Sequence, residues 1–498
     1  MRLNDHSAGA IRRTLALGSL LALPAVLTAC AVGPRYARPQ AQTPPGFKET
    51  PPGWTTAQPS DQIAKGKWWE IFRDDQLNTL EETINVSNQT LKAAEAQYTQ
   101  ARALVRFNRA DYFPTITGGF SAARTRESAN SVLKSRATFT DLTIPVDASY
   151  EPDVWGRVRR TVEISRANAQ ASAADLETVS LSLHAELAAD YFQLRELDAE
   201  EDLLLSTVTA YEQALELTQN RFHGGVASGV DVAQAQTLLE TTRAQAIDVS
   251  LQRAQFEHAI AVLAGQSAST FKLPPSPLKT VPPAIPPGLP SQLLERRPDI
   301  AGAERRVAAA NANIGVARAG YFPVFSLTGS GGFESTSVTN LLDGPSGFAS
   351  LGASALMTVF DVGRRRAVSD QAWAAYDQSV ANYRETVLSA YQDVEDNLAA
   401  LRILENEAKT QQAAVAAAEN SLNLSLTRYR GGVTTYLEVT TAQGLALSDE
   451  RTAVQILGRR MTASVLLIKG LGGGWDSSSL PAKPECCGKL VSQNQKTN

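Results

Sequence analysis

The chain has 498 residues, 43% of them hydrophobic and 7% aromatic, and its formal net charge is -4. The length allows roughly two to four ordinary domains. The near-balanced charge argues against nucleic acid as a partner, since such proteins usually show a basic surplus. Three cysteines, Cys30, Cys486 and Cys487, leave no disulfide across the body of the chain, so we expect its stability to come from packing and assembly.

Residues 1–29 predict a secretory signal peptide. Arg12 and Arg13 precede an apolar run over 15–27, and small residues come directly before Cys30. This order is typical of a secretory signal, and the run is too short to span a membrane. Small residues before a cysteine also match the bacterial lipobox, so we expect lipidation of Cys30. An ordinary signal peptide with an incidental cysteine is the alternative.

Residues 30–65 are rich in Pro, Gln, Thr and Gly and predict a lipidated, extended N-terminal tether. Trp68, Trp69 and Phe72 then open the folded body as core residues. Apolar residues at spacings of three, four and seven predict a helix over 77–111.

Two strands are predicted next, over 115–127 and 136–150. The second alternates apolar with polar residues, which is typical of a transmembrane β-hairpin. A second hairpin is predicted at about 323–360, and the glycine-rich stretch 329–332 lies in one of its strands, with no lysine-bearing helix after it to suggest a phosphate loop. Beyond the signal no apolar run of about 18 residues remains, so any membrane crossing falls to strands.

Two very long helices are predicted over 157–222 and 364–430, which contain neither Pro nor Gly. At 1.5 Å per residue each would reach roughly 100 Å. Apolar residues in both runs step by threes and fours, as in the seam of a coiled coil. Two isolated helices of this kind would expose apolar flanks, so further helices should surround them.

The chain is internally duplicated. Residues 428–433 (RYRGGV) repeat 221–226 (RFHGGV), an offset of 207 positions, and 318–323 repeat 109–114. Glycine pairs between helical runs allow a chain reversal. Gly224, Gly225, Gly431 and Gly432 therefore predict the tips of two helical hairpins, at about 222–231 and 429–438.

These features divide the mature chain into two halves. The first structural repeat covers 66–270 and the second 293–469, joined by a Pro-rich linker over 271–292. Within them, helices are predicted from Asp231 to about residue 263 and from Pro298, which suits a first helical turn. Residues 470–498 are rich in Gly, Ser and Lys and are predicted to be disordered.

Four strands per chain cannot close, and an open sheet edge cannot lie in lipid. Because barrels start at about eight strands, either a dimer or a trimer would suffice. The inventory thus predicts a barrel shared between subunits and continued by a helical tube.

Several motifs give the chain a family resemblance. They are Cys30 with GPRY at 33–36, ADYFP at 110–114, ERRPDI at 295–300, and the paired hairpin tips. With them the chain resembles the outer membrane factor family, the TolC/OprM/NodT type of efflux lipoprotein, along nearly all of the mature sequence. The resemblance implies a mainly α fold with a transmembrane β-barrel. It also implies a homotrimer, in which four strands per chain form a twelve-stranded outer-membrane barrel continued by a long α-helical barrel.

The resemblance also implies a function. The chain would be the outer-membrane exit duct of a tripartite efflux pump, lipid-anchored and extending into the periplasm. It would passively conduct drugs or other small toxic compounds, and a periplasmic adaptor and an inner-membrane RND-type pump would open it. A lipid-anchored periplasmic adaptor and an exit duct for type I protein secretion are the alternatives. Substrates and the partner pump stay open.

The resemblance assigns gate residues as well. Asp231 and Tyr429 match positions that link neighbouring hairpins and hold the pore shut, through a charge-assisted hydrogen bond. The alternative is that Asp231 caps the helix that begins at Val232.

Leu437, Glu438 and Thr441 match the pore constriction of the family. Relatives carry aspartates near the last two positions, so Glu438 could supply a ring of carboxylates, whereas Thr441 departs from the pattern. Glu438 could equally be an exposed first-turn carboxylate that the helix dipole stabilises.

An enzyme is not expected. The four histidines are dispersed, and neither a nucleophile elbow nor a zinc-binding helix motif is present. We therefore predict no catalytic residue, cofactor or metal site.

Overall fold

The computed structural model describes residues 31–49, 66–130, 137–285 and 292–480. Cys30 and the other two cysteines, Cys486 and Cys487, lie outside these residues. Two compact units make up the chain: one contains 98–172 and 303–383 with the N-terminal residues to 40, and the other contains the remainder. Among the helices of the described part, none is both long and apolar enough to cross a membrane.

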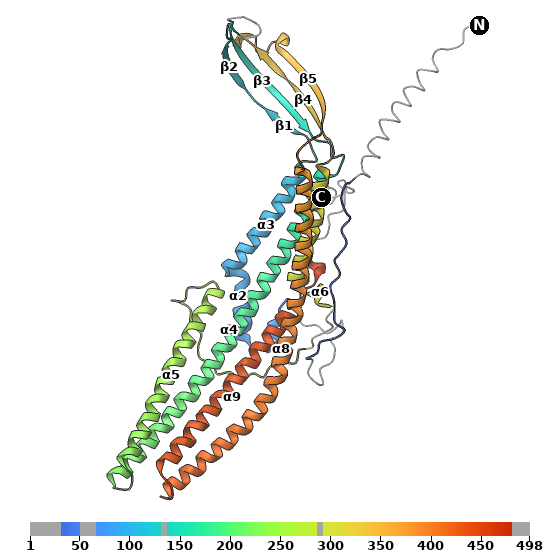
Figure 1. Cartoon of the computed structure of the whole chain (residues 1–498). Coiled ribbons are helices and arrows are strands. Elements are labelled where there is room, and N and C mark those ends of the chain that lie inside the picture. The colour runs from blue at the N-terminus through green and yellow to red at the C-terminus, as the bar shows by residue number, and fades with distance from the viewer. Residues whose placement is uncertain (1–30, 50–65, 131–136, 286–291, 481–498) are drawn as a thin grey trace, which may run out of the picture. The chain divides into compact units, whose positions relative to one another are not determined.

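The first unit holds one antiparallel sheet (Figure 1). Its strands are β1 (Thr115–Gly118), β2 (Ser121–Arg126), β3 (Thr138–Tyr150), β4 (Val324–Ser335) and β5 (Gly347–Leu356). The order is β1 and β2 side by side along one edge of β3, then β4, then β5. Both predicted hairpins are thus present, and the contact between β3 and β4 joins them.

Five strand segments occur where four strands were predicted. β1 and β2 pair with β3 in one continuous register, from Thr115 opposite Ser149 to Arg126 opposite Thr138. Between them Gly119 N donates to Pro145 O (3.1 Å), but Pro145 has no N–H to return a bond. The two segments are therefore one strand, interrupted opposite a proline.

The glycine-rich stretch 329–332 lies inside β4, as predicted. A Cβ at Gly332 would lie 2.0 Å from the carbonyl oxygen of Ile144 on β3. Only glycine allows the two backbones to approach this closely.

Helices of the first unit begin or end beside the sheet. They are the last part of α3 (Gln89–Ala110), the starts of α4 (Arg157–His223) and α8 (Arg364–Arg430), and most of α7 (Pro298–Ala319). Trp155, just before α4, donates from Nε1 to Pro323 O (2.8 Å), and its ring stacks on that of Phe322 at 4.7 Å. This contact ties the end of the first repeat's hairpin to the start of the second's.

The described part of the tether packs along these helices. Val32 N donates to Trp155 O (3.1 Å), and the Tyr36 hydroxyl donates to Glu304 on α7. Gly33 lies so close to α7 that a Cβ would sit 2.6 Å from the Cα of Gly315, and its φ of +113° also favours glycine. The GPRY motif therefore fits the chain against α7.

The second unit is helical. It contains a short 3-10 helix η1 (Trp68–Phe72), α2 (Asp75–Ser87), α5 (Gly229–Leu263), α6 (Leu293–Arg296), α9 (Tyr436–Gly470) and the remaining parts of α3, α4, α7 and α8. Trp68, Trp69 and Phe72 are buried, as predicted. Leu204 of α4, Val249 of α5 and Leu447 of α9 share one core cluster, so the two hairpins pack against each other.

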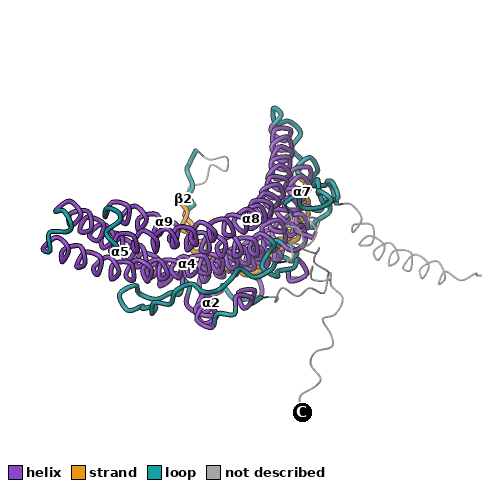
Figure 2. Tube along the Cα trace, turned by 90° about the horizontal axis from the view of Figure 1, so that it is seen from below, coloured by secondary structure: helices purple, strands orange, loops and turns teal. Residues whose placement is uncertain are grey.

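The two long helices are as predicted: α4 and α8 have 67 residues each. Figures 1 and 2 show α5 beside α4 and α9 beside α8. Arg243 of α5 pairs with Glu212 of α4, and Gln411 of α8 donates to Asp449 O of α9 (3.0 Å). The sequence therefore folds back at both tips.

The single helix predicted over 77–111 is wrong, because it breaks at Asn88. Asn88 Nδ2 donates to Leu263 O at the end of α5 (2.9 Å), and its Oδ1 accepts from Leu91 N (2.9 Å). The side chain thereby ends one helix and begins the next.

The disorder predicted from residue 470 begins too early. Residues 471–480 are described and include a short 3-10 helix, η5 (Ser477–Ser479). Leu471 is buried, and Arg297 Nη1 donates to Gly470 O (3.2 Å). The end of α9 is thus fixed against the start of α7.

Candidate gate at the helical tips

The two hairpin tips have nearly the same backbone. Gly225 N donates to Phe222 O (2.9 Å) in the first, and Gly432 N donates to Tyr429 O (3.0 Å) in the second. Their φ angles are +73° and +74°, the left-handed conformation that ends helices. Of the four predicted tip glycines these two carry the reversal, because Gly224 and Gly431 keep negative φ.

A capping box closes the first tip. Ser228 is the N-cap of α5, and its Oγ accepts from Asp231 N (3.3 Å). In return Asp231 Oδ2 accepts from Ser228 N (2.8 Å) and from Ser228 Oγ (3.0 Å). Each side chain satisfies a backbone N–H of the other residue at the helix start.

Asp231 is therefore not the N-cap that the sequence suggested, because α5 begins two residues earlier, at Gly229. The Ser-x-x-Asp spacing could have indicated this role. In the described chain Asp231 bonds only to Ser228, and the Tyr429 hydroxyl has no hydrogen-bond partner. The hydrogen bond expected between Asp231 and Tyr429 is thus not made within one chain.

An ion pair across the turn closes the second tip. Arg428 Nη1 donates to Glu438 Oε1 (2.9 Å), and the Thr434 hydroxyl donates to the other carboxylate oxygen. Glu438 is the counterpart of Asp231 by the offset of 207. Thr435, the counterpart of Ser228, makes no capping bond with its side chain. Glu438 thus holds the end of α8 to the start of α9.

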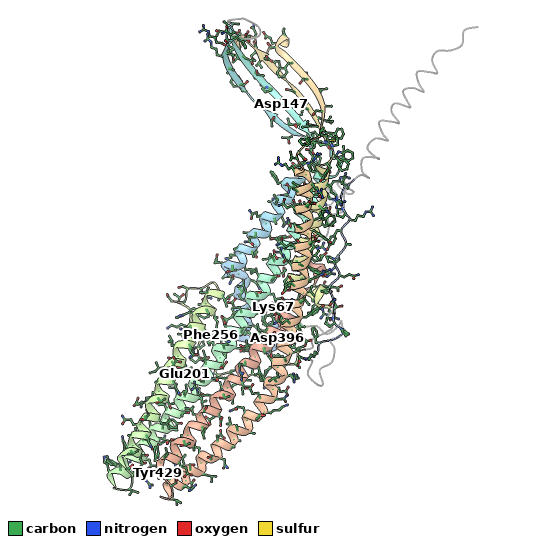
Figure 3. The ribbon with its side chains drawn as sticks, in the orientation of Figure 1. Lys67, Asp147, Glu201, Phe256, Asp396 and Tyr429 are labelled. Atoms are coloured by element: carbon green, nitrogen blue, oxygen red, sulfur yellow. The ribbon has the colours of Figure 1, made fainter. Side chains whose placement is uncertain are left out.

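Tyr429 is buried where the two tips meet (Figure 3). Its ring packs against that of Tyr436 at 5.1 Å and shares a core cluster with Ala235 of α5. The Arg221 guanidinium lies 4.6 Å above it, and Arg221 Nη1 donates to Arg430 O (3.4 Å). Arg221 therefore links the first tip to the second, a role that sequence reasoning missed.

Leu437 and Thr441 lie on the surface of α9. The Leu437 side chain is 58% exposed, and the Thr441 hydroxyl donates to Leu437 O (2.8 Å) within the helix. Leu437 also lines a groove of about 570 Å³ between the starts of α5 and α9, opposite Val230. Leu437 thus presents apolar surface at the tip.

Burial raises the pKa of Tyr436 to about 12, although a hydrogen bond with Thr218 acts in the other direction. The nearby Tyr429 and Asp231 contribute to the increase.

No group of three His, Cys, Asp or Glu side chains that could hold a metal occurs within the described ranges. The tips offer hydrogen bonds, one ion pair and apolar surface. Such contacts can hold helices together or release them.

Comparison with known proteins identifies the fold and its setting. The family model described as outer membrane efflux protein matches residues 81–266 and 289–473, one segment in each half. The antibiotic efflux pump outer membrane protein ArpC of Pseudomonas putida is 32% identical, over 93% of this chain and 96% of that protein. The cation efflux system protein CusC of Escherichia coli O6:H1 is 30% identical, over 90% of this chain and 96% of that protein.

Comparison with solved structures also finds outer membrane channels. The outer-membrane channel OprN superposes with a TM-score of 0.83 at 31% identity, covering 90% of this chain and all of that one. The open state of the Neisseria gonorrhoeae outer membrane channel MtrE gives a TM-score of 0.78 at 26% identity, covering 90% of this chain and 99% of that one.

Proposed function

The chain belongs to the outer membrane efflux protein family, and from that membership we propose that it is the exit duct of a tripartite efflux pump. It resides in the outer membrane, as its efflux-channel relatives do. In this role it passively conducts small toxic compounds from the periplasm to the exterior. The match extends over both halves, which favours a duct over the periplasmic adaptor that the sequence left as an alternative.

The observation that carries the proposal is the sheet with two open edges. Within the described residues, β1 with β2 forms one edge of the sheet and β5 the other. Large apolar side chains stand exposed on it, Leu351 at 95% and Ile116 at 70% among them. Unpaired edges invite pairing with another chain, and exposed apolar surface calls for a lipid or protein neighbour.

The duplication indicates how copies would pair. By the repeat, β4 is the counterpart of β1 and β2, and β5 is the counterpart of β3. The contact of β3 with β4 inside one chain therefore has a natural equivalent in β5 pairing with the β1–β2 edge of the next copy. Repeated head to tail, such a joint closes into a ring.

We take that ring to be a homotrimer, as the family resemblance implies. Three chains would supply twelve strands for the outer-membrane barrel and, with α4, α5, α8 and α9 among their helices, the wall of a periplasmic tube. Lipidation of Cys30 would add an anchor in the same membrane.

The tips would form the periplasmic gate. Asp231 and Tyr429 lack a mutual bond in one chain but lie at tips that neighbouring copies would bring together. Leu437, Glu438 and Thr441 would line the narrowest part of the pore. A periplasmic adaptor, coupled to an inner-membrane RND-type pump, would open the gate. The binding energy of the adaptor can break the few hydrogen bonds and the ion pair at the tips.

The substrate class rests on relatives. Proteins named for efflux of antibiotics and of toluene are 32% identical over 93% of the chain, which supports small organic compounds. Deletion of the gene should raise the cellular accumulation of such compounds, and the wild-type copy should restore export. Unchanged accumulation, together with lost secretion of a protein, would favour the type I secretion alternative.

A cysteine cross-link tests the ring. Val146 of β3 pairs with Gly331 of β4, and the equivalent residues at the joint between copies are Ala353 of β5 and Ala122 of β2, which lie on the same face of the sheet. With Cys486 and Cys487 replaced by serine, Ala122→Cys plus Ala353→Cys should give covalent dimers and trimers on oxidation in membranes.

A matched control uses Ser354→Cys in place of Ala353→Cys. Its side chain points to the opposite face of β5, so cross-linking should fall sharply. Equal cross-linking in the two pairs, or none in either, would contradict the proposed joint.

A further inference from the structure

A cavity of about 520 Å³ lies between the two helical hairpins, near their tips. α4 lines it from Leu203 to Leu217, a length of about 20 Å, and α8 and α9 complete it. In Figure 3, Tyr429 lies near the helical tips and Glu201 farther from them. Volumes of a few hundred Å³ are typical of small-molecule sites.

We propose that this cavity binds a small amphipathic amine, with its apolar body against the leucines and its ammonium group between Gln443 and Glu450. The site lies between the hairpins of one chain and uses none of the residues assigned to the pore constriction. The proposal rests on the chain's own side chains, and it could hold whether or not the duct is gated as proposed.

Two buried polar atoms in the cavity lack partners. Tyr429 and Gln443 both line it, and each is only 4% exposed. Neither the Tyr429 hydroxyl nor Gln443 Oε1 has a hydrogen-bond partner. A buried polar atom without a hydrogen-bond partner destabilises the folded chain, so a ligand that donates an N–H to Gln443 Oε1 would gain a hydrogen bond that the chain itself does not make.

The charge of the site favours a cation. Glu450 lines the cavity and forms none of the ion pairs among the described residues. Burial raises the pKa of its carboxyl group, and the nearby Glu419 raises it further. Arg430 also lines the cavity, but from the tip end. Tyr436 and Glu450 are 14 positions apart on α9, a distance of about 20 Å along the helix.

The rest of the lining suits an apolar body with a cationic end. Leucines from all three helices, such as Leu203, Leu422 and Leu447, line the cavity together with three tyrosines. Aromatic faces attract an ammonium group as well as apolar surface. Water could satisfy the two polar atoms, but it would not use the leucines.

The first hairpin shows that the fold does not require the polar groups of Tyr429, Gln443 and Glu450. By the offset of 207, the counterparts of Tyr429, Gln443 and Glu450 are Phe222, Gln236 and Arg243. Phe222 has no hydroxyl, Gln236 is exposed, and Arg243 pairs with Glu212 and Glu240. The first hairpin forms the same turn without any acceptor of this kind.

Calorimetric titration of the purified full-length protein with 4-phenylbutylamine tests the proposal. The amine should bind saturably, and the uncharged 4-phenylbutan-1-ol about tenfold more weakly or worse. The trimethylammonium analogue of the amine lacks N–H donors, and its affinity should lie between those of the amine and the alcohol. Titration into detergent alone removes the micelle contribution.

Variants locate the site. Gln443→Leu and Glu450→Gln should each weaken amine binding about tenfold, whereas Gln236→Leu, at the exposed counterpart, should leave it unchanged. Gln443→Glu adds a carboxylate of the same shape and should tighten binding of the amine but not of the alcohol, which guards against loss through misfolding.

Equal affinities for the amine and the alcohol, or equal losses in Gln443→Leu and Gln236→Leu, would overturn the proposal. Failure of all three probes to bind would leave water as the occupant and would also overturn it.

Discussion

The two helical tips have the same backbone conformation but differ in the side-chain contacts that stabilise it. At the first tip the ties are local, between Ser228 and Asp231 inside one helical turn. At the second they reach across the reversal, from Arg428 to Glu438. A local tie stabilises the start of one helix whatever its neighbours do, whereas a cross-turn tie sets the spacing of α8 and α9. The duplicated turn therefore has the same backbone conformation in both hairpins. The contact that sets the spacing of two helices belongs to the second hairpin only.

The same glycine substitution should destabilise the turn equally in either tip. Gly225→Ala and Gly432→Ala each force an L residue into φ near +73°, at a cost of roughly 1–2 kcal/mol. Thermal unfolding should show similar losses for both. Gly224→Ala and Gly431→Ala are the controls and should cost much less, because φ is negative there and the nearest backbone atoms lie at 3.5 Å. Unequal losses would show that the turns are not equivalent.

The capping contacts should respond unequally. Ser228→Ala removes both hydrogen bonds of its side chain and should cost about 1 kcal/mol. Thr435→Ala should cost almost nothing, because Thr435 makes no side-chain capping bond. Hydrogen exchange of the backbone amides in the first turns of α5 and α9 would measure the two effects separately. A larger effect at Thr435 would reverse the comparison.

High pH should weaken the second tip. Burial raises the pKa of Tyr436 in the folded chain to about 12, above its usual value near 10. Its contribution is therefore complete below pH 10 and is lost as the pH rises from 10 towards 12, by about 1 kcal/mol at pH 11. Tyr436→Phe should lose less stability than wild type between pH 9 and pH 11 in matched unfolding curves. Parallel curves would exclude this role. The first tip has Gly229 at the equivalent position.

Salt should produce the smallest effect. Arg428 and Glu438 are about half exposed, and exposed ion pairs contribute at most about 1 kcal/mol. Glu438→Gln should therefore lower stability slightly at low salt and not at 1 M salt, where screening is nearly complete. A loss that persists at high salt would mean that Glu438 acts through the Thr434 hydrogen bond instead.

Much of this fold can be predicted from the sequence where local pattern decides. Stretches free of Pro and Gly gave α4 and α8, and the repeated RxxGGV stretches gave both tips. The break at Asn88 could not be predicted, because its partner Leu263 is distant in sequence. The interruption between β1 and β2 depends likewise on a proline in the paired strand.

The candidate site divides in the same way. The turn glycines follow from sequence alone, whereas the N-cap of α5, predicted at Asp231, lies at Ser228. The stacking of Arg221 on Tyr429 and the burial of Tyr429 depend on how the hairpins pack. The roles of Asp231 and Tyr429 at the gate depend on neighbouring copies, which no single chain contains.

Single-channel recording in a planar bilayer tests the gate most directly, with wild type, Asp231→Ala and Ser228→Ala compared. Both variants break the same capping box, but only Asp231→Ala removes the carboxylate available to a neighbouring tip. We predict small discrete channels for wild type and Ser228→Ala, and larger ones for Asp231→Ala with the assembly intact. Equal conductance in all three would contradict gating by Asp231, and silence from all three correctly folded proteins would contradict the duct itself.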